Sequence, residues 1–234
     1  MIAIFKRELD AYFDTPLGYV FLAVYELLAG YFFFSYNLYG NSTDMRSLFE
    51  MLFTITIFLI PVLTMRLMSE DRRSKTDQLL LMAPISALEI VLGKFLAAAA
   101  VYLTAMSVTL VQAFVLSRMA AVEWSVVLGH FIGLFLLGCA LIALGLFISS
   151  LTENQIIAAI GGFCAGFFLM LLDSLSGLMK NSALAGFVTD LSFRTHYQNF
   201  TLGVFDLADV VFYLSITSMF VFFSLCAFEK RRMV

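Results

Sequence analysis

Six separate stretches of this 234-residue chain are long and apolar enough to cross a lipid bilayer as helices. A spanning helix needs about 20 mostly apolar residues. The six stretches are residues 17–38, 50–68, 91–117, 125–149, 154–172 and 208–228. Apolar and polar residues do not alternate within them, as they would in the strands of a membrane barrel. The sequence therefore predicts an all-α, polytopic membrane protein with six transmembrane helices.

The composition excludes several other classes of protein. Hydrophobic residues make up 62% of the chain and charged residues 13%, against about 45–50% and about 25% in soluble domains. Intrinsic disorder requires the opposite balance, with low hydrophobicity and high charge. The 14 Lys and Arg residues and 17 Asp and Glu residues give a net charge of −3. This balance argues against a nucleic-acid-binding protein.

Basic residues are distributed unevenly between the two sides that six spans define. Ten of the 14 fall on the side of the two termini: Lys6, Arg7, Arg66, Arg72, Arg73, Lys75, Lys94, Lys230, Arg231 and Arg232. The remaining four are Arg46, Arg118, Lys180 and Arg194. Because cytoplasmic loops carry the excess of Lys and Arg, we expect both termini and the 69–90 segment to be cytoplasmic.

Two segments outside the spans are amphipathic. Residues 1–16 place apolar side chains on one helix face, which predicts an interfacial helix, with a turn into the first span at Thr15–Pro16. Acidic Glu8 and Asp10 precede the first span, so we do not interpret it as a cleavable signal. The external 173–207 connection is partly apolar, and we expect short interfacial helices there.

Motifs for enzyme chemistry are missing from the sequence. It has no phosphate-binding loop, no G-x-S-x-G nucleophile motif and no H-E-x-x-H zinc pair. Cys139, Cys164 and Cys226 fall on three different spans, and His130 and His196 are far apart in sequence. These five residues are more typical of helix packing than of a metal site. We therefore predict no catalytic residue, no metal and no cofactor in this chain.

The segment between the second and third spans carries the most specific signal. A polar, helix-forming run of charged residues is followed by apolar Leu79–Leu80 and by Pro84, which stops a helix. Ser86 and Glu89 have capping-box spacing at the start of the next helix. A short charged helix with an apolar edge suits docking into a groove of a partner protein. The alternative is a solvated loop that only follows the positive-inside rule.

This segment resembles the permease subunits of type-2 ABC exporters, in particular the short six-span branch that includes gliding-motility and copper-enzyme-maturation permeases. The resemblance rests on an ordered set of residues: Glu70, Arg72–Arg73, Thr76–Asp77, Leu79–Leu80, Pro84–Ile85–Ser86 and Ile90–Val91–Leu92–Gly93–Lys94. It extends to Asp14–Tyr19 and to Gly203–Asp206. Lys75 replaces a glycine usual in the family, and Asp77 replaces a glutamate.

The resemblance implies a single permease domain over residues 1–234, with a connector helix at 1–16, a coupling helix at 69–83 and a short external helical segment at 173–207. It assigns contact with a separate cytoplasmic ABC ATPase, which binds ATP and Mg, to these residues: Glu70, Asp71, Arg72, Arg73, Thr76, Asp77, Leu79, Leu80 and Pro84. It also implies a second permease copy or homologue in the cell membrane of a prokaryote. The chain would not be catalytic by itself. The expected function is efflux of an amphipathic or lipophilic substrate; the alternative is a non-transporting mechanotransmission or assembly subunit.

Two features inside the spans remain open to more than one interpretation. Glu26 lies near the middle of the first span, where an ionised carboxylate is unfavourable. It either lines the substrate path or subunit interface, or is protonated and bonded to a neighbouring helix, with Gln112 as a candidate partner. Ala158, Gly162 and Gly166 have four-residue spacing that favours close helix packing. That packing is either within the bundle or, by the family resemblance, with the partner subunit.

Overall fold

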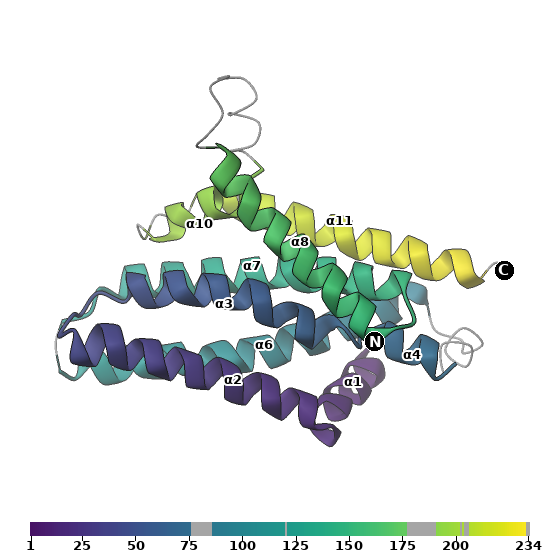
Figure 1. The fold of residues 1–234 in the computed structure, drawn as a ribbon, viewed down its shortest axis with the longest axis horizontal. Coiled ribbons are helices and arrows are strands. Elements are labelled where there is room, and N and C mark those ends of the chain that lie inside the picture. Colours follow the sequence, from purple (N-terminus) through teal and green to yellow (C-terminus); the bar gives the residue numbers. More distant parts are fainter. Residues whose placement is uncertain (76–85, 120, 177–190, 202, 204–205, 233–234) are drawn as a thin grey trace.

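A computed structural model describes residues 1–75, 86–119, 121–176, 191–201, 203 and 206–232. These residues form helices without a strand. The elements are α1 (Ile2–Asp14), α2 (Pro16–Phe33), the π-helix η1 (Phe34–Tyr39), α3 (Arg46–Thr64), α4 (Ser69–Arg73), α6 (Ala87–Ser117), α7 (Trp124–Leu151), α8 (Gln155–Ser176), α10 (Phe193–Thr201) and α11 (Leu207–Arg232). Figure 1 shows both termini and α4 at the same end of an elongated bundle.

The predicted all-α architecture with six spans is confirmed. Within the described residues, six helices have the length and hydropathy needed to cross a membrane. Their bounds differ from the predicted stretches by a few residues, and the first span ends in η1 rather than in a regular α-helix. Helix α7 is the most apolar span, with a mean hydropathy of 2.8. It lies at the centre, because it contacts α3, α6, α8, α10 and α11.

A buried tyrosine joins four of these helices near the middle of the bundle. The Tyr102 hydroxyl of α6 donates to the Leu134 carbonyl of α7 at 3.0 Å and lies 3.3 Å from Thr56 Oγ1 of α3. The Tyr25 ring of α2 meets the Tyr102 ring edge to face, with centroids 6.2 Å apart. Gly138 of α7 leaves the space for this ring, since a Cβ there would lie 2.0 Å from Tyr102 Cε1.

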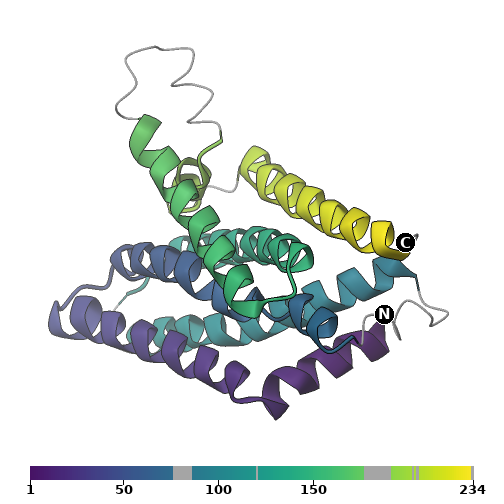
Figure 2. The same cartoon turned by 45° about the vertical axis from the view of Figure 1, so that its right-hand side comes forward.

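A sharp corner joins α1 to α2, as Thr15 and Pro16 predict. Thr15 is extended, with φ −105° and ψ 154°, and Pro16 occupies the first turn of α2. Figure 2 shows α1, in the darkest purple, meeting the first span at this corner. The Tyr12 hydroxyl donates to the Leu63 carbonyl of α3 at 2.8 Å. Burial raises the pKa of Tyr12 well above its ordinary value, so the phenol keeps the proton that makes this bond.

Helix α4 covers the first five residues of the predicted coupling helix, 69–83. Helix α4 ends at Arg73, and Lys75 adopts φ 57° in the left-handed region. This conformation is uncommon for residues other than glycine and terminates a helix. The rest of the predicted helix lies outside the described residues.

Candidate functional site

Charged side chains gather at the end of the bundle that carries α4, which we call the charged end. Lys94 of α6 is 2% exposed, and its Nζ lies 2.9 Å from Glu8 Oε1 of α1 and 2.6 Å from Asp71 Oδ2 of α4. Arg7 adds ion pairs to the same two carboxylates, with its Nη2 at 3.6 Å from Asp71. Gly93 lets α1 approach α6 closely here, because a Cβ at that position would lie 2.9 Å from Ile4 Cγ2. A buried ammonium therefore links α1, α4 and α6.

A second set of contacts ties α4 to the connection between α7 and α8. Ser149 Oγ accepts hydrogen bonds from the backbone N–H groups of Met68 and Ser69 at 3.0 and 3.1 Å. Its hydroxyl lies 3.2 Å from the Met65 carbonyl, to which it donates. Arg72 donates to the Ser150 carbonyl at 3.1 Å and pairs with Glu153 at 3.1 Å. A displacement of α4 must therefore move α7 and α8 as well as α1 and α6.

Replacing Ser149 tests this attachment. Ser149→Ala removes the acceptor for two buried N–H groups, which we expect to reduce stability by about 2 kcal/mol. The measurement is the thermal unfolding midpoint in detergent. Ser117→Ala is the matched control, because the Ser117 hydroxyl is exposed and donates only to the Phe114 carbonyl of its own helix. Equal midpoints for both variants would contradict a role for Ser149 in holding α4.

The structure divides the predicted coupling residues into two groups. Asp71 and Arg72 point into the bundle through the contacts above. Glu70 is 44% exposed and pairs with Arg66 one turn earlier, at 2.7 Å. Arg73 is exposed and forms no ion pair with any residue that the structure describes, and the same holds for Lys75, which was not a predicted coupling residue. Five further predicted coupling residues lie outside the described residues: Thr76, Asp77, Leu79, Leu80 and Pro84.

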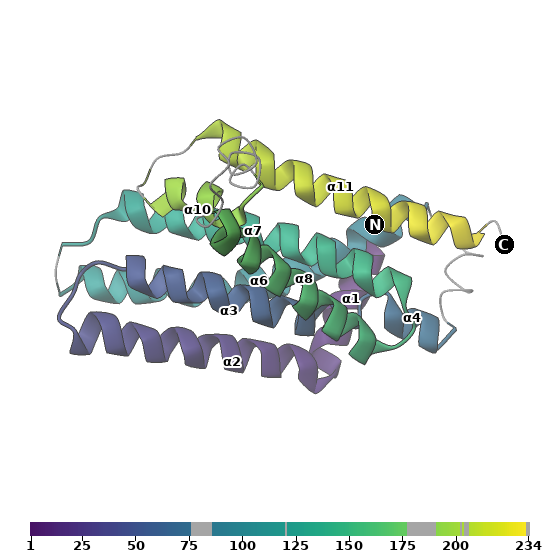
Figure 3. The ribbon, with the colours of Figure 1, turned by 45° about the horizontal axis from the view of Figure 1, so that its top comes forward.

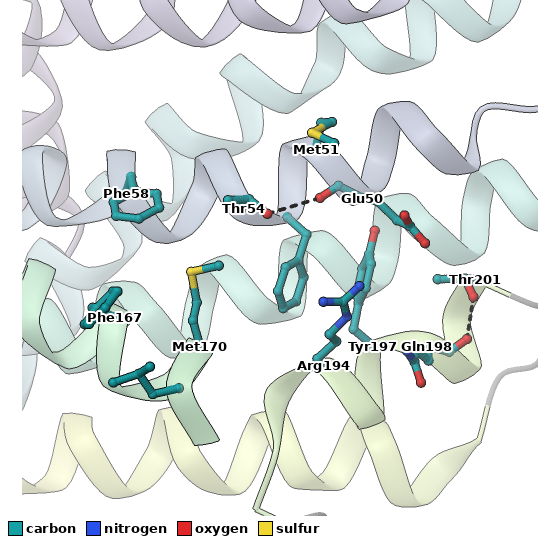
Figure 4. A pocket seen from close by; sticks show the side chains of 12 residues that line it. Glu50, Met51, Thr54, Phe58, Phe167, Met170, Arg194, Tyr197, Gln198 and Thr201 are labelled. Atoms are coloured by element: carbon teal, nitrogen blue, oxygen red, sulfur yellow. Dashed lines mark hydrogen bonds between the residues drawn. The ribbon is translucent and has the colours of Figure 1, made fainter. Parts of the chain in front are cut away.

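A pocket of about 470 Å³ opens between α3, α8 and α10 (Figure 4). Its apolar wall includes Phe58 of α3 and Phe167, Met170 and Leu171 of α8. Its polar end is lined by Glu50 and Thr54 of α3 and by Arg194, Gln198 and Thr201 of α10. Apolar surface at one end and hydrogen-bonding and charged groups at the other fit an amphipathic molecule.

Helix α10, which lines this pocket, lies toward the end of the bundle remote from α4 (Figure 3). Its Tyr197 hydroxyl shares a 3.0 Å hydrogen bond with Nδ1 of His130 in α7, and the His130 ring stacks on Phe49. On its other side, Asp209 of α11 is 2% exposed and binds His196 Nδ1 at 2.6 Å and Asn199 Nδ2 at 2.8 Å. Both histidines thus hold α10, the predicted short external helix, against α7 and α11.

Glu26 lies on the outer face of α2 and is exposed. Tyr25 and Ala29 of the same helix are fully buried, so the neighbouring position faces away from the bundle. Gln112, the candidate partner, is 8% exposed in α6, and its Oε1 has no hydrogen-bond partner among the described residues. The pairing of Glu26 with Gln112 is therefore wrong. Glu26 is therefore an outward-facing polar side chain within a span. The interpretation that remains for it is a position on the substrate path or at a subunit interface.

The Ala158, Gly162 and Gly166 stripe packs within the chain. A Cβ at Gly162 would lie 2.8 Å from Pro61 Cβ, and one at Gly166 would lie 2.7 Å from Ile57 Cγ2. Ala158 is 3% exposed on the same face of α8. Because α3 of the same chain fills this stripe, the structure does not bring it to an open face where a second subunit could meet it.

Sequence reasoning did not find the buried Lys94 cluster. In the sequence, Lys94 belongs to the motif at the start of the third span and to the basic residues of the cytoplasmic side, and Glu8 is an acid before the first span. The available signal was a single lysine in an otherwise apolar run, since a buried lysine needs a carboxylate partner. Among the described residues, no group of three His, Cys, Asp or Glu side chains could hold a metal ion.

Six apolar spans and a charged end on which α4 is fixed define a multi-pass helical membrane protein. The chain belongs to the ABC-2 family of transporter proteins, whose sequence profile matches residues 8–230. It is a membrane permease subunit of an ABC transporter. No curated protein matches the sequence significantly.

Proposed function

We propose that this permease subunit couples ATP hydrolysis by a separate cytoplasmic ATPase to the export of an amphipathic or lipophilic substrate. ATP and Mg bind to the ATPase, and the charged end faces the cytoplasm. The segment that begins with α4 is the part of the permease that the ATPase contacts. Ten basic residues on this side support the orientation.

The attachment of α4 carries the proposal. A loop that only followed the positive-inside rule would need no fixed contacts with the bundle. Helix α4 is instead held by Asp71 to Lys94, by Arg72 to the α7–α8 connection, and by Ser149. Arg73 and Lys75, at its far end, are exposed and available to a partner. Such a segment can receive force from a partner through its exposed residues and transmit it to the bundle through its buried contacts.

The pocket between α3, α8 and α10 supports the substrate class. Its apolar wall accommodates a hydrocarbon portion, and Arg194 or Glu50 can pair with a charged head group. Helix α8 follows directly after the C-terminal end of α7, which Ser149 and Arg72 attach to α4. Movement of α4 would therefore reach one wall of the pocket through a single helix.

The proposal includes a second permease copy or homologue that packs on the outer face of α2. An acidic side chain exposed to hydrocarbon is unfavourable by about 3 kcal/mol. Glu26 is exposed among apolar neighbours such as Val24 and Leu27. Contact with a partner subunit would remove it from lipid, which supports an interface along this face.

Co-purification with the cognate ATPase tests coupling, and two kinds of variant separate its steps. Arg73→Glu with Lys75→Glu changes only exposed groups, so we expect the ATPase to be lost from the complex. Asp71→Asn weakens the internal link, so we expect the ATPase to bind and its stimulation by the permease to fall by about tenfold. Lys230→Glu, at the same end on α11, is the control for charge and should change neither readout.

Substrate export is tested in the same complex in proteoliposomes. Met170→Trp fills the pocket, and Met219→Trp on the outer face of α11 is its control. Loss of substrate-stimulated ATPase activity and of flux only in Met170→Trp supports export. A complex that binds and stimulates the ATPase, but moves none of a panel of amphipathic compounds, would instead identify the alternative mechanotransmission or assembly subunit.

A further inference from the structure

An apolar groove of about 400 Å³ runs between α1 and α6 on the outside of the charged end. Its walls come from three helices, and all its side chains are apolar. They include those of Ile2 and Phe5 of α1, Leu96, Ala100 and Leu103 of α6, and Phe135 of α7. Met1 also lines the groove, and its N-terminal ammonium pairs with Glu89 at 3.3 Å. The groove is separate from the pocket of Figure 4, with which it shares no residue.

Small residues on α6 create this groove. Positions 96, 99, 100 and 103 fall on one helix face, and two of them are alanine. Ala99 is 6% exposed and forms the floor, while Leu96 and Leu103 at the ends are 38% and 42% exposed. The seven residue steps from position 96 to position 103 span about 10 Å along the helix axis. The groove is therefore a narrow slot that runs along a spanning helix and is open to the lipid side.

The lining determines the class of ligand. A site without a hydrogen-bonding side chain cannot compensate a polar ligand for the loss of water. A hydrocarbon chain meets no such penalty and fills a slot of this shape through dispersion contacts. In a membrane-spanning chain, an open slot on the outer face is in direct contact with the acyl chains of lipids.

An exposed lysine lies on the face of α1 that carries Ile2, one of the residues lining this groove. Lys6 follows Ile2 by one helical turn, so the two share a face of α1. Lys6 is exposed and forms no ion pair with the described residues, whereas Arg7, Arg66, Arg72 and Lys94 at the same end all pair with carboxylates. An unpaired ammonium beside an acyl slot is complementary to an anionic phospholipid head group.

We propose that the groove between α1 and α6 binds one acyl chain of an anionic phospholipid, with its phosphate beside Lys6. Such a lipid contacts α1 and α6 together, on the outer face of the bundle. It is a specific ligand rather than a part of the fluid lipid layer. The proposal depends on the groove and on Lys6, and not on which substrate the permease moves.

Tryptophan quenching by brominated lipids tests this site, because the chain has one Trp. In a Trp124→Phe background, Leu96→Trp places an indole at the rim of the groove. Phe222→Trp, on the exposed face of α11, is the control. It lies at a similar distance from the charged end, since Phe222 is ten residues before the end of α11 at Arg232 and Leu96 is nine residues after the start of α6 at Ala87. Vesicles of phosphatidylcholine contain the same small fraction of either brominated phosphatidylglycerol or brominated phosphatidylcholine.

We expect brominated phosphatidylglycerol to quench the Leu96→Trp reporter at least threefold more than brominated phosphatidylcholine does. The two brominated lipids should quench the Phe222→Trp control to the same extent. Adding Lys6→Gln, or filling the groove with Ala100→Phe, should abolish the preference, whereas Lys230→Gln should leave it intact. Equal quenching of the groove reporter by both lipids would overturn the proposal. A preference that survives either Lys6→Gln or Ala100→Phe would overturn it as well.

Discussion

Lys94→Met is expected to destabilise the permease by about 3–5 kcal/mol, the effect of removing one partner from a buried ion pair. The substitution keeps the aliphatic stem but leaves Glu8 and Asp71 without the ammonium that lies 2.9 and 2.6 Å away. Arg7 cannot replace it, since Arg7 is 45% exposed and lies on the outer side of both carboxylates. The thermal unfolding midpoint in detergent should fall on the order of 10 °C.

A neutral triple variant separates lost charge pairing from lost packing. Lys94→Met combined with Glu8→Gln and Asp71→Asn removes all three charges, and we expect it to recover most of the stability, because well-packed neutral groups often replace a buried ion pair. Lys6→Met is the control for a lysine that is not paired. A triple variant as unstable as Lys94→Met alone would contradict the electrostatic explanation. The recovered protein should still fail to stimulate its ATPase, since α4 is no longer linked to α1.

Gly138→Ala is expected to have the second large effect on stability, lowering the free energy of unfolding by about 3 kcal/mol. The new Cβ would lie 2.0 Å from Tyr102 Cε1, so the ring must move. Overpacking of a core typically costs about 1–3 kcal/mol, and movement of Tyr102 also breaks its hydrogen bond to Leu134, for about 1 kcal/mol more. The readout is again the thermal unfolding midpoint, followed by circular dichroism.

Gly30→Ala is the matched control for this substitution, because no atom lies within 4 Å of a Cβ there. Alanine is favoured over glycine inside a helix, so Gly30→Ala should be neutral or slightly stabilising. Gly138→Ala with Tyr102→Leu should recover part of the loss by removing the ring that clashes. If Gly138→Ala unfolds at the wild-type temperature, the Tyr102 ring is not held by close packing.

Helix capping shows how local features were predicted correctly. Ser86 caps α6, and its side chain accepts from the Glu89 N–H at 3.3 Å, as the spacing of these residues predicts. Such a bond joins residues three apart and needs no knowledge of the rest of the chain. The end of α4 at Arg73 was not predicted, because the left-handed conformation of Lys75 is not a preference of lysine.

The direction in which a helix face points was harder to predict. The Gly162 and Gly166 spacing indicates close packing, but not whether the neighbour is α3 or another subunit. The same holds for Glu26, whose depth in the span is evident from the sequence while its outward direction depends on how α2 packs on α3 and α6. Rotation about the helix axis is decided by all the contacts of a helix at once.

The sequence by itself determined the number, type and approximate bounds of the spans, because hydrocarbon requires about 20 apolar residues that satisfy their own backbone hydrogen bonds. It also carried the family membership, through an ordered set of short motifs. Only the tertiary structure decided which polar groups meet. Lys94 and Glu8 are 86 residues apart in the chain, and Ser149 and Met68 are 81 apart. Such pairs form when packing brings distant helix ends together, and no local pattern encodes them.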